Sequence, residues 1–159
     1  MNKRALIQKI VARLTEELQV YFRAAQFSRA EATHESSKAE SKYDTRGLEA
    51  SYLARGQSKQ AAELEAAIAE FEKLPAKKFG PDEPVGLGAL VELETGGEKL
   101  FYFLGPRAGG TEILHDQKEI LVITPQSPLG EQLMGKKTGD QLPLTFGGAK
   151  QSAKILRVE

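Results

Sequence analysis

The chain has 159 residues, and its 22 Lys or Arg residues balance 22 Asp or Glu residues, so no net charge attracts it to nucleic acid or to a membrane surface. The absence of cysteine excludes disulfides, zinc–thiolate sites and thiol chemistry. No run of about 18 apolar residues occurs, and the basic start MNKRALIQKIVARL is typical of an amphipathic helix rather than a signal peptide. We therefore expect a cytoplasmic protein with no membrane partner.

The first predicted helix begins within the opening residues. One face of a helix is predicted by residues spaced by threes and fours: Ile7, Ile10, Leu14, Leu18, Tyr21 and Ala25. The pattern weakens after this point, where small residues follow that still tolerate a helix. The spacing predicts a long helix with one apolar stripe.

The start of this helix is strongly basic. Lys3, Arg4, Lys9 and Arg13 give four positive charges and no negative one within the first 15 residues. This suits an acidic or phosphate-bearing surface, and it equally suits a solvated helix face.

A second apolar stripe follows an interruption at residues 42–57, KYDTRGLEASYLARGQ. It is a near-heptad seam of Leu53, Leu64, Ile68, Phe71 and Leu74, with polar gaps at Gln57 and Gln60. Two helices joined by a short turn fold back on each other as an antiparallel hairpin. Such a hairpin could also be a plain spacer or an oligomerisation coiled coil, so the pattern alone leaves its role open.

The interruption itself has the residues of a turn and a new helix start. Asp44 or Thr45 can cap the second helix, because a side-chain oxygen there satisfies free N–H groups of the first turn. Gly47 fits the turn geometry. Gly56 lies inside the second helix, where glycine is unfavourable, and we predict that it marks a kink or a close approach to the first helix.

The composition changes sharply after residue 74. Residues 75–159 contain all seven prolines and thirteen of the fifteen glycines. This step predicts a hairpin domain at 1–74, a linker at 75–85 and a second domain at 86–159.

The second domain shows the pattern of short strands and one helix. Gly96-Gly97 predicts a hairpin turn between the first two strands. Ser127 fits a helix N-cap, Pro128 the first helical position and Gly135 the position just past the end. The expected strands cover residues 89–94, 99–104, 111–114, 119–125, 141–146 and 152–159. The fold class is therefore α+β, an α-helical coiled-coil hairpin followed by an antiparallel sheet with one short helix.

Residues 122–159, VITPQSPLGEQLMGKKTGDQLPLTFGGAKQSAKILRVE, resemble the C-terminal domain of the Gre transcription elongation factors. The shared features are Ser127-Pro128, a short helix ending in Leu-x-Gly-Lys, then Gly139-Asp140, a Gly-Gly turn, and a last strand with Ile155 and Val158. The family places an antiparallel coiled-coil hairpin before this FKBP-like domain, and the order and length agree here. The resemblance covers the whole chain and is most specific in its last quarter.

The resemblance implies a partner, bacterial RNA polymerase. In the family, the globular domain docks at the rim of the polymerase's secondary channel, and the hairpin enters the channel, with indirect contact to the nascent RNA. The residues that would face the polymerase are those carrying the family pattern: Ser127, Pro128, Gly135, Lys136, Lys137, Gly139 and Asp140. The protein would be an accessory factor rather than an enzyme.

The resemblance also implies a role for carboxylates at the hairpin tip. In the family, an Asp-x-x-Glu pair helps the polymerase hold a second Mg²⁺ that supports hydrolysis of backtracked RNA. Here Asp44 and Glu49 are five residues apart, which matches the family pair with two residues inserted, whereas Glu40 and Asp44 form an i, i+4 pair if the first helix continues. No cofactor of its own is expected, only Mg²⁺ shared with the polymerase. A Gre homologue that occupies the channel without stimulating cleavage is the alternative.

The remaining tip residues have roles that the pattern leaves open. Arg46 can contact phosphate or pair with a tip carboxylate. Gly47 lies in the sequence between the two tip carboxylates, Asp44 and Glu49. Tyr43 and Tyr52 can close the tip by packing. Asp44 and Glu49 themselves also suit helix capping and the helix dipole.

An enzyme of another class, a peptidyl-prolyl isomerase, is disfavoured. That activity needs a concave aromatic pocket, and three of the four aromatic residues concerned are consecutive. Phe101, Tyr102 and Phe103 must alternate across a strand, so they cannot line one pocket together with Phe146. Fold similarity alone does not establish the activity.

Overall fold

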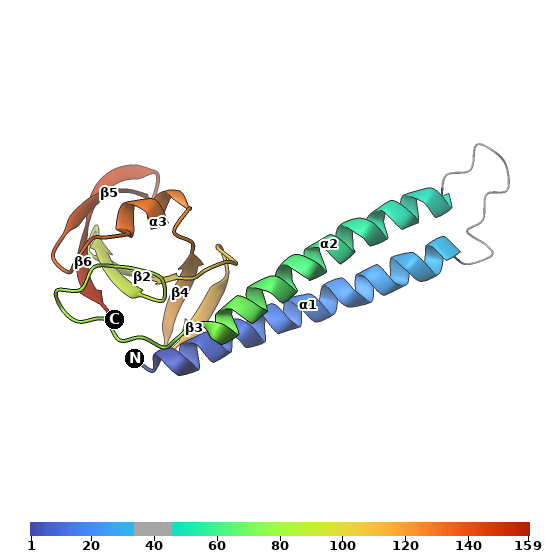
Figure 1. Ribbon diagram of the computed structural model, residues 1–159. Coiled ribbons are helices and arrows are strands. Elements are labelled where there is room, and N and C mark those ends of the chain that lie inside the picture. Colours follow the sequence, from blue (N-terminus) through green and yellow to red (C-terminus); the bar gives the residue numbers. More distant parts are fainter. Residues whose placement is uncertain (34–45) are drawn as a thin grey trace. The chain divides into compact units, whose positions relative to one another are not determined.

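The computed structural model describes residues 1–33 and 46–159, with the side chains of residues 25–55 and of Gln57 outside the description. Helix α1 covers Lys3–Thr33 and helix α2 covers Arg46–Lys73 (Figure 1). The chain forms two compact units. One contains Met1–Val11 and Glu70–Glu159 and is called the sheet unit below; the other, Ala12–Ala69, is called the helical unit.

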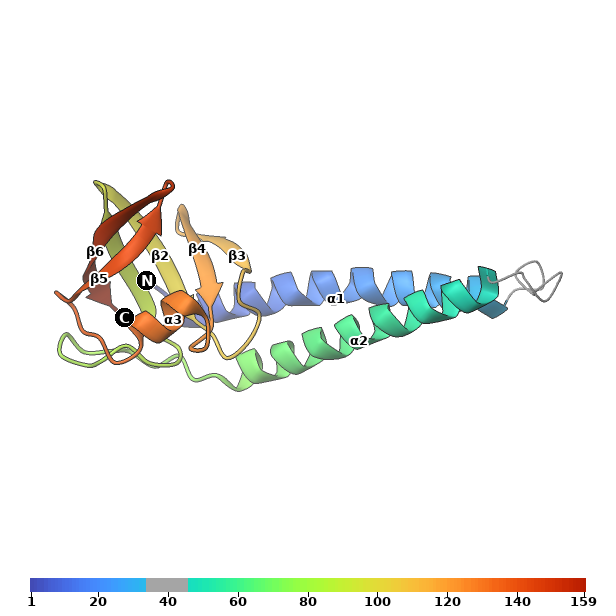
Figure 2. The same cartoon turned by 90° about the horizontal axis from the view of Figure 1, so that it is seen from above.

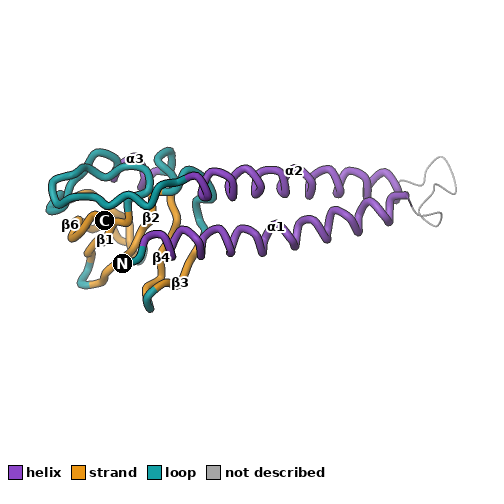
Figure 3. The backbone as a smooth tube through the Cα atoms, turned by 60° about the horizontal axis from the view of Figure 1, so that its bottom comes forward, coloured by secondary structure: helices purple, strands orange, loops and turns teal. Residues whose placement is uncertain are grey.

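The helical unit contains most of α1 and α2, which run in opposite directions along each other (Figures 1 and 3). The predicted stripe of α1 is confirmed in its first part. Ile7 and Ile10, which belong to the sheet unit, and Leu14 are buried, whereas Leu18 and Tyr21 are half-buried. The predicted seam of α2 is only partly correct. Two alanines, Ala61 and Ala67, are buried there, whereas Leu64 and Ile68 of the seam are half-buried.

Two glycine predictions concern residues of α2. Gly47 is the second residue of the helix, which begins at Arg46, so it does not form the turn. At Gly56 we predicted a kink or a close approach to the first helix. A Cβ added there would meet no described atom within 4 Å, which gives no support to a close approach, and the kink stays a prediction.

The sheet unit is built on six strands in the order β3-β4-β2-β1-β6-β5. Their bounds are β1 Leu90–Thr95, β2 Glu98–Leu104, β3 Glu112–His115, β4 Lys118–Ile123, β5 Gln141–Phe146 and β6 Ala149–Val158. Helix α3, Pro128–Leu133, lies beside β5 (Figure 2). The predicted strands and short helix are thus confirmed, with ends shifted by up to three residues.

Three two-residue turns connect neighbouring antiparallel strands. Both residues of each turn have positive φ, which matches the right-handed twist of the flanking strands. Two of the turns are Gly96-Gly97 and Gly147-Gly148, as the glycine pairs predict. The third is Asp116-Gln117, with φ of 50° and 62°. It contains no glycine, so the sequence did not predict it.

One strand pairing differs from the wholly antiparallel sheet that we expected. Strands β2 and β4 are parallel, with Phe101 opposite Ile120 and Leu104 opposite Ile123. Strand β3 is inserted between them in the chain and takes the edge of the sheet, paired only to β4 among the described strands. The connection from β2 to β3 therefore passes the position of β4, which later fills the place between them. The sheet is mostly rather than wholly antiparallel.

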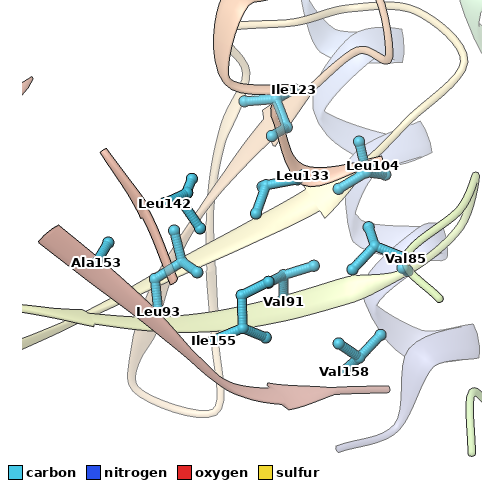
Figure 4. Packing of buried hydrophobic residues seen from close by; sticks show 11 residues of the cluster. Val85, Val91, Leu93, Leu104, Ile123, Leu133, Leu142, Ala153, Ile155 and Val158 are labelled. Atoms are coloured by element: carbon cyan, nitrogen blue, oxygen red, sulfur yellow. The ribbon is translucent and has the colours of Figure 1, made fainter. Parts of the chain in front are cut away.

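The core of the sheet unit lies between one sheet face and α3 (Figure 4). Leu133 of α3 and Leu93 of β1 are fully buried within it. The buried members of this cluster are Val85, Ala89, Val91, Leu93, Leu104, Ile123, Leu133, Leu142, Ala153, Ile155 and Val158. All of them lie after residue 84, so this core is made entirely by the second half of the chain.

A second set of buried side chains comes from the helix ends that belong to the sheet unit. Phe71 of α2 stacks on Phe103 of β2, with ring centroids 6.4 Å apart. Leu6 and Ile10 of α1 are fully buried. A Cβ added to Gly105 would come within 2.6 Å of the Phe71 ring, so a glycine is needed there for the ring to pack.

The predicted linker makes specific contacts. Val85 exchanges backbone hydrogen bonds with Gly135 and Lys136, at 2.9 and 2.7 Å, and its side chain is in the core. Phe79 packs against the same core. Part of the 75–85 segment is therefore fixed to the sheet unit.

Among the described residues, neither long helix is apolar enough over its length to cross a membrane.

Candidate functional site

The candidate site is the segment from Ser127 to Asp140, which we call the docking segment. It begins with a well-formed helix cap. The Ser127 Oγ accepts a hydrogen bond from the Gly130 N–H at 3.1 Å and donates one to the Thr124 carbonyl at 2.7 Å. Pro128 occupies the first helical position, where its missing N–H has no cost. The cap and the proline are as predicted.

The first turn of α3 lies directly on the preceding strand end. Gly130 is buried, and a Cβ added to it would lie only 1.8 Å from the carbonyl oxygen of Thr124. Any side chain there would push α3 away from the end of β4. Gly130 thus sets how closely the docking segment sits on the sheet.

The end of α3 is held by the segment that precedes the first strand. Gly135 has a φ of 80°, which suits glycine just past a helix end. Its N–H donates to the Val85 carbonyl, and the Val85 N–H donates to the Lys136 carbonyl. The backbone at Lys136 is therefore fixed even though the side chain is only half-buried.

The last part of the docking segment is a turn closed by Asp140. One oxygen of its carboxylate accepts a hydrogen bond from the Lys137 N–H at 2.8 Å, and its own N–H donates to the Lys137 carbonyl. The Gly139 N–H and the Asp140 carbonyl both bond to Ile155 of β6. Asp140 therefore has a clear structural role, and Gly139, with a φ of 92°, allows the turn.

The surface of the docking segment combines positive charge with exposed carbon. Pro128, Met134 and Lys137 are exposed, and Lys136 is half-buried. No hydrogen bond or ion pair joins the ammonium group of Lys136 or Lys137 to another described residue. A rigid backbone thus presents two unpaired cations beside an exposed methionine, an arrangement that suits an acidic protein surface.

The tip residues that we selected from the sequence fall outside what the structure describes. Glu40, Tyr43 and Asp44 lie in the segment 34–45. Four others lie in the first two turns of α2, but their side chains are outside the description: Arg46, Gly47, Glu49 and Tyr52. Among the described residues, no group of three or more His, Asp or Glu side chains could hold a metal ion. The carboxylate pair therefore stays a prediction from the sequence.

Comparison with known families gives a match that covers all six strands and α3. Residues 80–159, half of the chain, match the sequence model of the GreA/GreB transcription elongation factors, C-terminal region. The chain belongs to this family. The matched residues of this GreA/GreB-family chain include the whole docking segment.

Solved structures with a likeness to the chain include two Gfh1 proteins. The GreA factor homolog 1 of Thermus thermophilus is 26% identical, with 94% of each chain covered and a TM-score of 0.40. Gfh1 of Thermus aquaticus is 26% identical over 99% of this chain and 94% of that one, with a TM-score of 0.41. A GreA/GreB factor from Nitrosomonas europaea is 22% identical over 62% and 78%, with a TM-score of 0.38. Family membership rests on residues 80–159, because TM-scores this low do not establish a shared overall arrangement. No curated protein matches the chain.

Sequence reasoning missed three residues that shape the sheet unit of this GreA/GreB-family chain. Val85 and Gly130 fix the docking segment, as described above. Lys3 is buried at 7% exposure, and its ammonium donates to the carbonyl of Lys77 and, at 2.5 Å, to a main-chain oxygen of Glu159. A signal for Lys3 was present, since it lies four residues before Ile7 on the apolar stripe.

The environment of Lys3 changes its ionisation. Burial disfavours the charged ammonium and lowers the pKa of Lys3 from 10.5 to about 8, while the carboxylates of Glu159 and Glu83 act in the opposite direction. The ammonium also lies 4.6 Å from the centre of the Phe79 ring. Lys3 thus joins the start of α1 to the end of β6 and to the segment before β1.

Proposed function

We propose that this chain binds bacterial RNA polymerase through the docking segment and places its hairpin in the secondary channel, where it modulates transcript elongation. The observation that carries the proposal is the family match over residues 80–159, which contain the docking segment. Under this proposal the protein works in the cytoplasm, and the polymerase supplies the catalytic site.

The geometry of the docking segment supports this role. Its backbone is held at Ser127, Val85 and Asp140, so little ordering would be needed on binding. Its unpaired Lys136 and Lys137 suit a partner surface rich in carboxylates, and Met134 offers apolar contact. The secondary-channel position itself comes from the family resemblance.

The test is the affinity for core RNA polymerase of the variant Lys136→Glu/Lys137→Glu. We expect at least a tenfold loss at moderate salt, because two attractive charges become repulsive ones. The matched control is Lys150→Glu/Lys154→Glu, which makes the same charge change at exposed positions of β6. Equal affinity of the two variants would show that the docking segment is not the interface.

Two roles are open for the tip once the chain is bound. In the first, Asp44 and Glu49 hold a Mg²⁺ shared with the polymerase, an ion that stabilises the attacking and leaving oxygens during cleavage of backtracked RNA. In the second, the chain occupies the channel and excludes cleavage factors. The five-residue spacing of Asp44 and Glu49, against three in the family pattern, favours the second role.

A stalled elongation complex separates the two roles. If the chain lends carboxylates, wild type shortens the transcript, and Asp44→Asn/Glu49→Gln abolishes cleavage without changing polymerase affinity. If it is a channel occupant, wild type never shortens the transcript but inhibits a cleavage-competent Gre factor in a concentration-dependent way. A chain that does neither would not be acting through the secondary channel.

A further inference from the structure

A cavity of about 580 Å³ opens at the start of α1, away from the docking segment. All of its lining residues belong to the sheet unit. They come from the start of α1, the segment after α2 and the end of β6: Met1, Asn2, Lys3, Arg4, Ala76, Lys78, Phe79, Arg157 and Glu159. This volume is within the range of about 300–1,000 Å³ that small-molecule sites occupy.

The wall of the cavity is strongly cationic. Four of its side chains are positive. The one acidic side chain, that of Glu159, is paired with Arg157 at 2.5 Å and with the Met1 amino group at 3.5 Å. Arg4 and Lys78 are exposed, and neither has a hydrogen-bond or ion-pair partner among the described residues. Two cations are therefore left without a counter-charge beside a concave surface.

The backbone adds to this positive potential. Helix α1 begins at Lys3, and its first turn contains no acidic residue. Asn2 accepts a hydrogen bond from the Ala5 N–H at 3.1 Å, which leaves the N–H groups of Lys3 and Arg4 at the helix start without an intrahelical acceptor. The helix dipole and the cationic side chains thus favour an anion at the same place.

The Phe79 ring limits what the anion can be. The ammonium groups of Lys3 and Lys77 lie 4.6 and 4.7 Å from its centre, so both are held at this ring. A flat base would therefore find its stacking position contested by ammonium groups. Phosphate oxygens, in contrast, can accept from the fork of Arg4, from Lys78 and from the helix N–H groups without displacing any contact.

We propose that this cavity binds a compact oligophosphate group, either free or carried by a nucleotide. A flat cationic patch would suit a nucleic-acid backbone, whereas these residues surround a concave space of small-molecule size. The proposal is independent of polymerase binding, because no residue of the docking segment lines the cavity.

The test is calorimetric titration of the full-length protein with inorganic triphosphate, ATP, adenosine and a ten-nucleotide RNA without a 5′ phosphate, at constant ionic strength. We expect saturable one-to-one binding of triphosphate and none of adenosine. ATP that binds more tightly than triphosphate would identify a nucleotide as the source of the phosphates, and equal or weaker ATP binding would show that the phosphates alone are recognised. Binding of the RNA alone would overturn the proposal.

The matched variants are Arg4→Ala/Lys78→Ala and Lys150→Ala/Lys154→Ala, which remove the same charge from exposed positions. The first should weaken triphosphate binding at least tenfold, and the second should change it less than twofold. The single variants Arg4→Gln and Lys78→Gln should each give an intermediate loss. Equal weakening by both double variants, or no saturable binding to wild type, would show that only general electrostatic attraction is present.

Discussion

The sheet unit and the helical unit bury different kinds of side chain. The sheet unit has eleven large, fully buried residues, among them Phe71, Phe103 and Leu133. In the helical unit, the buried hydrophobic residues among the described side chains are Leu14, Ala61 and Ala67. Among the described side chains, the sheet unit therefore buries larger apolar groups than the helical unit does. Substitutions should affect the two units by different mechanisms.

The largest effect is expected where a helix end meets the sheet. Phe71→Ala should lower the free energy of unfolding by about 3–5 kcal/mol, because it leaves a cavity beside Phe103. The matched control is Phe22→Ala in the helical unit, where the ring is 43% exposed and the change should be within about 0.5 kcal/mol. Chemical denaturation measures both. Similar losses would contradict the difference in packing between the two units.

The next effect is a pH dependence that originates at Lys3. Its folded-state pKa of about 8 lies below the unfolded value of 10.5, so the unfolded chain binds more protons between these values. Burial of the charged ammonium therefore costs stability below pH 8, and this cost disappears as the pH rises towards 10.5. The free energy of unfolding of wild type should therefore rise by about 3 kcal/mol relative to that of Lys3→Met between pH 7 and pH 11. A difference that does not change with pH would show that Lys3 is not desolvated.

A smaller loss is expected from the contact that places α3. Gly130→Ala sets a methyl carbon against the Thr124 carbonyl and should destabilise the sheet unit by about 1–3 kcal/mol. Because α3 must move, the variant should also bind core polymerase more weakly. Gly135→Asn is the comparison, since asparagine tolerates positive φ and nothing lies within 4 Å of the added Cβ. Unchanged stability of Gly130→Ala would mean that α3 is not closely packed on the strand end.

The smallest effect has the opposite sign and tests the helical unit. Gly56→Ala should stabilise the protein by about 1 kcal/mol, because alanine is the better helix former and its methyl group would meet no described atom within 4 Å. Thermal unfolding followed by circular dichroism at 222 nm would detect it. A loss of stability would contradict this expectation and indicate a close approach to another segment at Gly56.

Local signals in the sequence predicted much of the sheet unit. Ser127-Pro128 and Gly135 marked the ends of α3, and the glycine pairs marked two turns, because caps and turns depend on neighbouring residues. The parallel pairing of β2 with β4 was not predictable in this way. It depends on which strands meet in space, and the turn Asp116-Gln117 carries no glycine to signal it.

The candidate site, like the sheet unit, was predicted only in part from the sequence. The family pattern selected the docking segment, but the residues that hold it in place lie elsewhere in the chain. Val85 was assigned to a linker because it follows three prolines, yet its backbone pairs with Gly135 and Lys136. Lys3 was read as part of a basic helix start, and its burial follows from partners more than 70 residues away. Long-range partners of this kind leave no local pattern in the sequence.

The most direct test of the account is a titration of labelled full-length protein with core RNA polymerase, followed by fluorescence anisotropy. The account predicts saturable one-to-one binding that is displaced by a cleavage-competent Gre factor and weakened at least tenfold by Lys136→Glu/Lys137→Glu. Absence of saturable binding, or binding that a Gre factor does not displace, would contradict the proposal that the chain acts in the secondary channel.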